Sequence, residues 1–159
     1  MSEGGNYRSR NLTEEIRRHS SLRPHGHIFH AYQIYERDRR LIYHTNVMMA
    51  ITEKNVVICL DSIDDPKERK YVIDQIKGSG KNIVPITEEQ VENFAGNMLQ
   101  VLGGDGKPLT VMSQSAYECL TAEQRSSLEA EAQLLYSDLS TIETCGGGSA
   151  RCMMAEVFL

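Results

Sequence analysis

Cys152 and His44 are the two residues of this chain whose types could form a catalytic pair. Cys152 follows the run GGGSAR at residues 146–151 and opens an apolar segment that reaches residue 159. A thiolate attacks electrophilic carbon, and an imidazole can take or share the thiol proton. The glycines leave space for a ligand to approach main-chain N–H groups beside the thiol. The pattern therefore predicts nucleophilic chemistry at Cys152, against the alternative of a glycine-rich turn followed by a buried cysteine.

The spacing of three residues suggests how this pair could meet. His44, Asn97 and Cys152 each stand at the start of a short apolar segment, 53 and 55 residues apart. Equivalent positions in units arranged around an axis converge on that axis. We therefore expect His44 and Cys152 to lie at one centre, although a histidine in the setting of His44, taken alone, is more often a half-buried structural residue.

A repeated strand–strand–helix–strand pattern must position these residues. In the first copy we expect two strands, a helix and a third strand at residues 47–51, 56–60, 66–77 and 83–86. In the second copy we expect a hairpin of strands 98–102 and 109–112, a helix that opens at Thr121 with Gln124 completing a capping box, and a strand at 133–136. Residues 151–158 predict the first strand of a third unit, and a helix at 13–19 with a strand at 28–32 predicts the tail of an earlier one. The expected fold class is α/β, with about two complete units and two partial ones.

The composition narrows the class of protein. The chain has 159 residues, 40% hydrophobic and 25% charged, with a net charge of -5. These values fit one globular domain and argue against binding to nucleic acid or to an anionic membrane, because phosphates attract clustered positive charge. There is no apolar stretch of about 18 residues and no secretory signal pattern, so we expect a cytoplasmic protein. The four cysteines form no CxxC pair and are expected to be free thiols, namely Cys59, Cys119, Cys145 and Cys152.

Three segments resemble a known family. They are YHTNVMM at residues 43–49, FAGNML at 94–99 and GGGSARCM at 146–153. These segments look like the C-terminal half of amidinotransferase-superfamily enzymes, most closely the citrulline-utilisation hydrolase type, and the resemblance runs from about residue 28 to residue 159. The superfamily includes arginine deiminases, dimethylarginine hydrolases and amidinotransferases, which adopt the pentein fold, a five-bladed propeller of ββαβ units. The resemblance implies a partial pentein-type α/β propeller over residues 25–159, after a polar leader at 1–24.

The resemblance also implies a mechanism and a substrate class. Cys152 would attack the central carbon of a guanidino or ureido group, expel ammonia or an amine, and leave a covalent thiouronium-type adduct that water resolves. His44 would act as acid for the leaving group and then as base for the water. Backbone groups of Gly147 and Gly148 would contact the substrate, and Asn97 would help to shape the pocket. No cofactor and no metal would be required.

Asn46 departs from the pattern of arginine deiminases, where the residue two after the histidine is commonly a carboxylate that binds the guanidinium cation. A carboxamide cannot neutralise a cation, but it donates and accepts hydrogen bonds. We therefore expect Asn46 to contact the substrate and to favour a neutral, citrulline-like ureido group over an arginine-like cation.

The length gives a second departure, because about 50 residues per unit allow roughly three blades rather than five. The family's N-terminal half, which supplies further carboxylates, is expected to be missing. An open ring would expose strand edges and apolar faces, so self-association or a complementing N-terminal-half chain is an expected partner. The alternative function is a truncated, catalytically inactive homologue, or a half-propeller that requires such a partner chain.

A histidine cluster offers a different class of function. His25, His27 and His30 lie close enough in sequence to share a transition metal. In an extended strand, however, His25 and His27 point to one face and His30 to the other. We therefore do not expect a metal site here.

Overall fold

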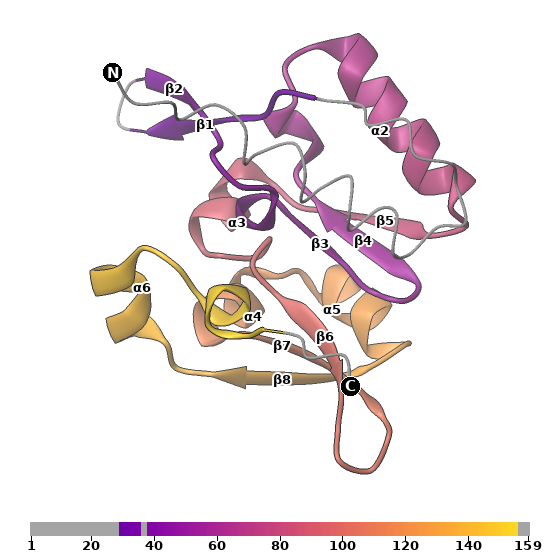
Figure 1. The fold of residues 1–159 in the computed structure, drawn as a ribbon, viewed down its shortest axis with the longest axis vertical. Coiled ribbons are helices and arrows are strands. Elements are labelled where there is room, and N and C mark those ends of the chain that lie inside the picture. The colour runs from indigo at the N-terminus through magenta and orange to yellow at the C-terminus, as the bar shows by residue number, and fades with distance from the viewer. Residues whose placement is uncertain (1–28, 36–37, 156–159) are drawn as a thin grey trace.

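The computed structural model describes residues 29–35 and 38–155, and its strands form three small sheets in that part of the chain (Figure 1). An antiparallel hairpin of β1 (Tyr32–Tyr35) and β2 (Asp38–Leu41) comes first. Two three-stranded sheets follow, in the orders β3-β4-β5 and β6-β7-β8. The fold is thus mixed α/β with small mixed sheets.

The two larger sheets belong to two units of the same design. The first unit contains β3 (Met49–Ile51), β4 (Asn55–Ile58), α2 (Pro66–Gly78) and β5 (Asn82–Pro85). The second contains β6 (Leu99–Leu102), β7 (Pro108–Ser113), α4 (Gln114–Cys119), α5 (Ala122–Glu129) and β8 (Gln133–Ser137). In each unit the first two strands pair antiparallel and the last two pair parallel. The predicted ββαβ repeat is confirmed in the described residues.

Local sequence explains where the helices begin. The Asp65 side chain accepts a hydrogen bond from the N–H of Lys67, and Pro66 occupies the first turn of α2, where its missing N–H has no cost. Thr121 and Gln124 form the predicted capping box at the start of α5. A second capping box, which the sequence analysis did not include, joins Thr87 and Gln90 at the start of α3 (Glu88–Glu92).

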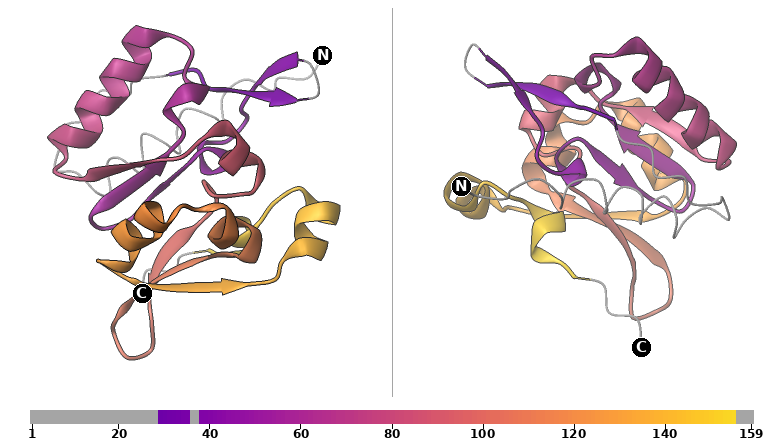
Figure 2. Two further views of the ribbon diagram at one scale, coloured as in Figure 1. Left: turned by 180° about the vertical axis from the view of Figure 1, so that it is seen from behind. Right: turned by 45° about the horizontal axis from the view of Figure 1, so that its top comes forward.

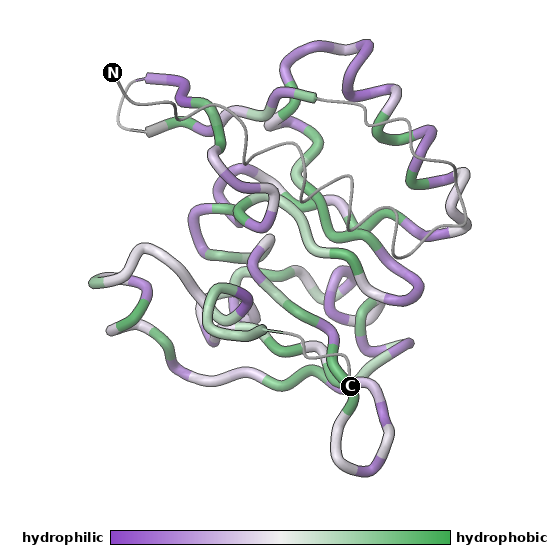
Figure 3. The backbone as a smooth tube through the Cα atoms, viewed as in Figure 1, coloured by the Kyte–Doolittle hydropathy of each residue, from purple (hydrophilic) through white to green (hydrophobic). Residues whose placement is uncertain are grey.

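One apolar core joins the two units. Its fully buried members come from both, and include Val57, Ile58, Ile63, Met98, Met112 and Leu128. Helix α5 contacts both β8 and β5, so it lies between the two sheets, as the left view of Figure 2 shows. The strands of the first sheet are largely apolar, whereas α2 alternates between apolar and polar positions around its axis (Figure 3). The units therefore form one body in which the starts of β3 and β6 can lie close together.

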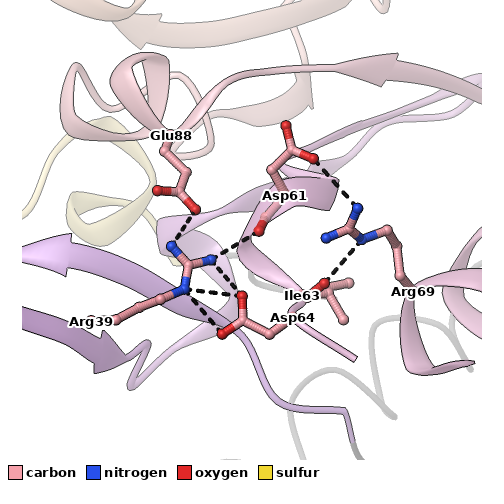
Figure 4. A network of polar contacts seen from close by, with 6 residues as sticks. All are labelled: Arg39, Asp61, Ile63, Asp64, Arg69 and Glu88. Carbon is pink, nitrogen blue, oxygen red and sulfur yellow. Dashed lines mark hydrogen bonds and ion pairs between the residues drawn. The ribbon is translucent and has the colours of Figure 1, made fainter. Parts of the chain in front are cut away.

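An ionic network ties the hairpin to the first unit (Figure 4). The Arg39 guanidinium on β2 forms ion pairs with Asp64 at 2.6 Å and with Glu88 at 2.8 Å, and it donates to the Asp61 carbonyl at 3.0 Å. The hydrogen bond to Asp64 is the main cause of a raised pKa at Arg39, and it also lowers the pKa of Asp64. Arg69 donates to the Ile63 carbonyl at 2.9 Å and so holds the same loop from the other side.

Some predicted elements differ from the structure. The strand predicted at 151–158 is wrong at its start, because residues Ala150–Met153 form a 3-10 turn, η3, and the residues from 156 lie outside the described part. The strand predicted at 47–51 begins only at Met49, because Thr45–Val47 form another 3-10 turn, η1. The strand predicted at 28–32 is replaced by β1, which begins where that prediction ends. The predicted leader at 1–24 and helix at 13–19 lie outside the described residues.

Among residues 29–35 and 38–155, none of the helices has the length and apolar character needed to cross a membrane.

Candidate active site

Cys152 lies on a short turn that follows a capped helix. Helix α6 (Ser140–Gly146) ends at Gly147, whose φ of 64° is left-handed and whose N–H donates to the Glu143 carbonyl at 3.2 Å. The glycine-rich run thus contains a helix cap, and η3 begins after Ser149. The N–H of Cys152 donates to the Ser149 carbonyl at 3.0 Å, which closes the turn and leaves the cysteine exposed. Cys152 is an exposed residue and is not part of the apolar core.

Two asparagine amides approach the sulfur of Cys152. The Asn97 Nδ2 donates to Sγ at 3.2 Å, and the Asn97 Oδ1 lies 3.7 Å from Sγ. The Asn46 Nδ2 is 3.9 Å from the same sulfur. Both side chains therefore hold the sulfur by hydrogen bonds, and the amide of Asn97 offers it a donor as well as an acceptor.

Asn97 also joins the first unit to the cysteine turn. Its Nδ2 donates to the Asn46 carbonyl at 2.9 Å, and its Oδ1 accepts from the N–H of Arg151 at 3.0 Å. Only 3% of Asn97 is exposed. Gly96 makes this approach possible, because a Cβ at that position would lie 2.5 Å from the Val47 carbonyl oxygen. The backbone before β6 therefore packs directly on the backbone before β3.

His44 reaches the same group of residues through Asn46. It caps η1, and its Nδ1 accepts a hydrogen bond from the N–H of Asn46 at 3.2 Å. Because Nδ1 is the acceptor, the neutral ring carries its proton on Nε2. Asn46 thus contacts His44 through its backbone and Cys152 through its side chain. The structure gathers His44, Asn46, Asn97 and Cys152 from three segments that are distant in the chain.

A network that the sequence analysis missed holds the glycine-rich loop. Ser149, which is fully buried, donates to the Glu143 carboxylate at 2.7 Å. Ser115 donates to the same carboxylate at 2.9 Å and contacts the Ser113 hydroxyl at 2.9 Å. The signal in the sequence was a serine between glycines and an apolar segment, a position where a polar side chain needs a partner. Through this network α6 and the start of α4 fix the loop that leads to Cys152.

The two predicted glycine contacts have different surroundings. Because the N–H of Gly147 caps α6, any contact of Gly147 with a substrate must use its carbonyl. A Cβ at Gly148 would lie 3.2 Å from both Cβ and Sγ of Cys152, so this glycine is directly beside the thiol. The remaining thiols, all in the described part of the chain, have other environments: Cys59 is buried, burial raises the pKa of Cys119, and Cys145 is exposed on α6.

The histidine cluster lies largely outside the described residues, since His25 and His27 are not among them. His30 Nδ1 pairs with the Glu68 carboxylate at 3.2 Å. Within residues 29–35 and 38–155, no group of three His, Cys, Asp or Glu side chains could hold a metal ion.

Comparison with protein families gives one match that covers most of the chain. The model of the family described as eukaryotic N,N dimethylarginine dimethylhydrolase matches residues 9–159. No curated protein matches the chain.

Solved structures give a consistent picture of the fold. The chain is similar to the product-bound N-terminal domain of ArgZ, an arginine dihydrolase from the ornithine-ammonia cycle in cyanobacteria, with 20% identity and a TM-score of 0.54 over 73% of this chain and 38% of that one. A variant of that domain bonded covalently to a reaction intermediate gives 19% identity and a TM-score of 0.51, over 69% of this chain and 36% of that one. Apo ArgZ gives 16% identity and a TM-score of 0.52, over 69% of this chain and 16% of that one. The chain thus matches a pentein-fold domain over part of its length, and it spans little more than a third of that domain.

Proposed function

The chain belongs to the eukaryotic N,N dimethylarginine dimethylhydrolase family, and from this premise we propose that it carries the nucleophile and the acid–base residue of a cysteine hydrolase. The substrate would be a guanidino or ureido compound with an arginine-like or citrulline-like group. The observation that carries the proposal is the setting of Cys152: the residue is exposed, two amides contact its sulfur, and His44 binds one of the same asparagines. We also propose that the protein is located in the cytoplasm.

The proposed reaction has two steps. In the first, the Cys152 thiolate bonds to the central carbon and the bond from that carbon to the leaving nitrogen breaks, while His44 gives a proton to the departing amine or ammonia. In the second, His44 takes a proton from water, the water oxygen bonds to the same carbon, and the carbon–sulfur bond breaks. A guanidino group becomes a ureido group and the thiolate returns. To give this first proton the His44 ring must carry hydrogen on both nitrogens, so the contact in which Nδ1 accepts from the Asn46 N–H would open for that step, and the proton would move through Nε2.

Neither step requires a redox change or an electrophilic metal, so we propose no cofactor. The Gly147 carbonyl and the Gly148 backbone would contact the planar head of the substrate beside the sulfur. The relatives support this chemistry by analogy: one ArgZ domain was captured with its substrate as a cysteine-to-serine variant, and another, an asparagine-to-serine variant, bonded covalently to an intermediate.

Asn46 supports the finer proposal of a citrulline-like substrate, as in the citrulline-utilisation hydrolase type. Its side chain is neutral and approaches the sulfur at 3.9 Å, where it would meet the head group of the substrate. A carboxamide can hydrogen-bond a ureido oxygen, whereas a guanidinium cation would gain more from a carboxylate. The family match and the ArgZ likeness favour an arginine-like guanidino group instead. Turnover assays with citrulline, arginine and dimethylarginine separate these candidates; turnover of arginine with citrulline inert would remove the citrulline proposal.

The active form would need more than this chain alone. In the second unit β8 is almost entirely exposed, and large apolar side chains remain exposed on β8, α6 and η3, namely Leu135, Tyr136, Ile142 and Met153. We propose that further ββαβ units, from self-association or from a complementing chain, cover these exposed side chains. The alternative is a catalytically inactive homologue, which would keep the Cys–His pair without turnover in any assembly.

Labelling with a haloacetamidine tests the site without requiring full turnover. We expect the reagent to modify Cys152 first, because its amidine resembles the substrate head group. His44→Ala should abolish this selectivity, Cys59→Ala should leave it unchanged, and Cys145→Ser serves as the control for an exposed thiol elsewhere. Equal labelling of all four cysteines would contradict the proposal.

A further inference from the structure

We propose that Asn97 is a positioning residue that holds the Cys152 sulfur in its reactive place, an inference that rests on the proposed function of Cys152. The two residues are 55 positions apart, yet the Asn97 amide touches the sulfur through its nitrogen at 3.2 Å and through its oxygen at 3.7 Å. A primary amide can present two N–H donors and an acceptor oxygen in one plane. At Asn97 all of these groups face protein atoms.

The hydrogen bonds of Asn97 fix its plane from three sides. One N–H points to the Asn46 carbonyl at 2.9 Å and the other to Sγ, while the oxygen accepts from the Arg151 N–H at 3.0 Å. Asn97 is a buried residue, with only 3% of its surface exposed. Rotation of the amide would break several of these contacts at once, so Asn97 is a rigid clamp.

The clamp acts on the place of the sulfur. The bond to the Arg151 N–H fixes the backbone of η3 one residue before Cys152, and the amide of Asn97 holds Sγ itself. Because the donors are directed at protein atoms, Asn97 contributes to the reaction through Cys152 and not through the substrate. This role differs from direct substrate binding, for which a side chain must leave a polar group facing the pocket.

Alkylation with iodoacetamide tests the clamp, because this neutral reagent needs no substrate pocket. Asn97→Asp keeps the shape and the acceptor for the Arg151 N–H but removes the N–H donors, and Asn97→Leu removes every polar contact. We expect both to slow alkylation of Cys152 about 10- to 100-fold, the factor that corresponds to one hydrogen bond to a charged group. Cys145 in the same sample should react at its wild-type rate. Wild-type rates at Cys152 in either folded variant would overturn the inference.

A measurement on the unaltered chain covers the case in which both variants fail to fold. Methylthiolation of Cys152 replaces the thiol by a disulfide and should shift the side-chain amide resonances of Asn97 in a nitrogen–proton NMR spectrum; unchanged resonances would overturn the inference. In an assembly with measurable turnover, Asn97→Asp should lower kcat with little change in KM. If the haloacetamidine shows no selectivity for Cys152 but the Asn97 variants still slow its alkylation by iodoacetamide, the result would contradict the proposed function and leave the role of Asn97 intact.

Discussion

Asn97 and Asn46 are hydrogen bonded to each other although they belong to successive units of the repeat. The Nδ2 of Asn97 donates to the Asn46 carbonyl at 2.9 Å, and both side chains approach the sulfur of Cys152. The segment before β3, the segment before β6 and the turn that carries Cys152 therefore meet at one point.

Gly96→Ala should separate the two asparagines. The new methyl group would lie 2.5 Å from the Val47 carbonyl oxygen and 2.7 Å from the Met48 carbonyl carbon, which are backbone atoms that cannot rotate away. We expect a loss of about 1–3 kcal/mol in the free energy of unfolding, as for other overpacked sites. Urea denaturation measures this change.

Gly104→Ala is the matched control for Gly96→Ala, because nothing lies within 4 Å of its added Cβ. Its effect should remain within about 0.5 kcal/mol. Equal stability of the two variants would mean that the backbones before β3 and β6 do not pack closely.

Gly148→Ala should slow the reactions of the Cys152 thiol while it changes the stability of the fold little. The added methyl group would lie 3.2 Å from both Cβ and Sγ of Cys152, a contact that a shift of the exposed cysteine can relieve. We expect slower labelling of Cys152 by a haloacetamidine, with a melting temperature close to that of the wild type. Gly146→Ala, whose nearest neighbour is the Ile142 side chain at 4.0 Å, provides a control in the same run. Comparable labelling rates for the two variants would contradict the expectation.

The repeat could be predicted from the sequence because its signals are local. The apolar runs of β4 and β7, the proline at the start of α2 and the capping box of α5 are all short-range patterns. The turn around Cys152 could not be predicted in this way. A glycine-rich run fits both a loop into a strand and a helix cap, and the choice depends on the contacts of Glu143 with Ser115 and of Asn97 with the cysteine turn, which join segments far apart in the chain.

The candidate site was only partly predictable for the same reason. The similar spacing of His44, Asn97 and Cys152 in the sequence predicted that their segments lie side by side. In the structure Asn97 contacts Asn46 and Cys152, because the turn η1 lies between His44 and the start of β3. Ser149 is held by Glu143 of α6, and α6 is a short helix that shows no extended repeat of apolar residues in the sequence. Such residues become visible only when the partners of buried polar groups are known.

Glu143→Ala should loosen the loop that carries Cys152. The change removes the carboxylate that accepts from Ser149 at 2.7 Å and from Ser115 at 2.9 Å, and Ser149 is fully buried. An unsatisfied buried hydroxyl costs about 1–3 kcal/mol, so we expect a loss of this size in the free energy of unfolding. Faster amide hydrogen exchange at residues 147–152 should accompany it. Glu143→Gln, which retains an acceptor oxygen, should lie between the wild type and the alanine variant; a fully stable alanine variant would show that the loop does not depend on Glu143.

Acid should weaken the attachment of the β1–β2 hairpin. The hydrogen bond from Arg39 lowers the pKa of Asp64 below that of an ordinary aspartate, so the ionised form is favoured by folding. The corresponding stability is present above about pH 4 and is lost as the pH falls through the lowered pKa. Because both side chains are more than a third exposed, at 34% and 47%, water screens the pair and the contribution should stay below about 1 kcal/mol.

Urea unfolding of the wild type and of Arg39→Gln at pH 7 and pH 2.5 measures this contribution. The difference in the free energy of unfolding between the two proteins should shrink at the lower pH and in high salt. A difference that grows on acidification would show that Asp64 is not stabilised in its ionised form by Arg39.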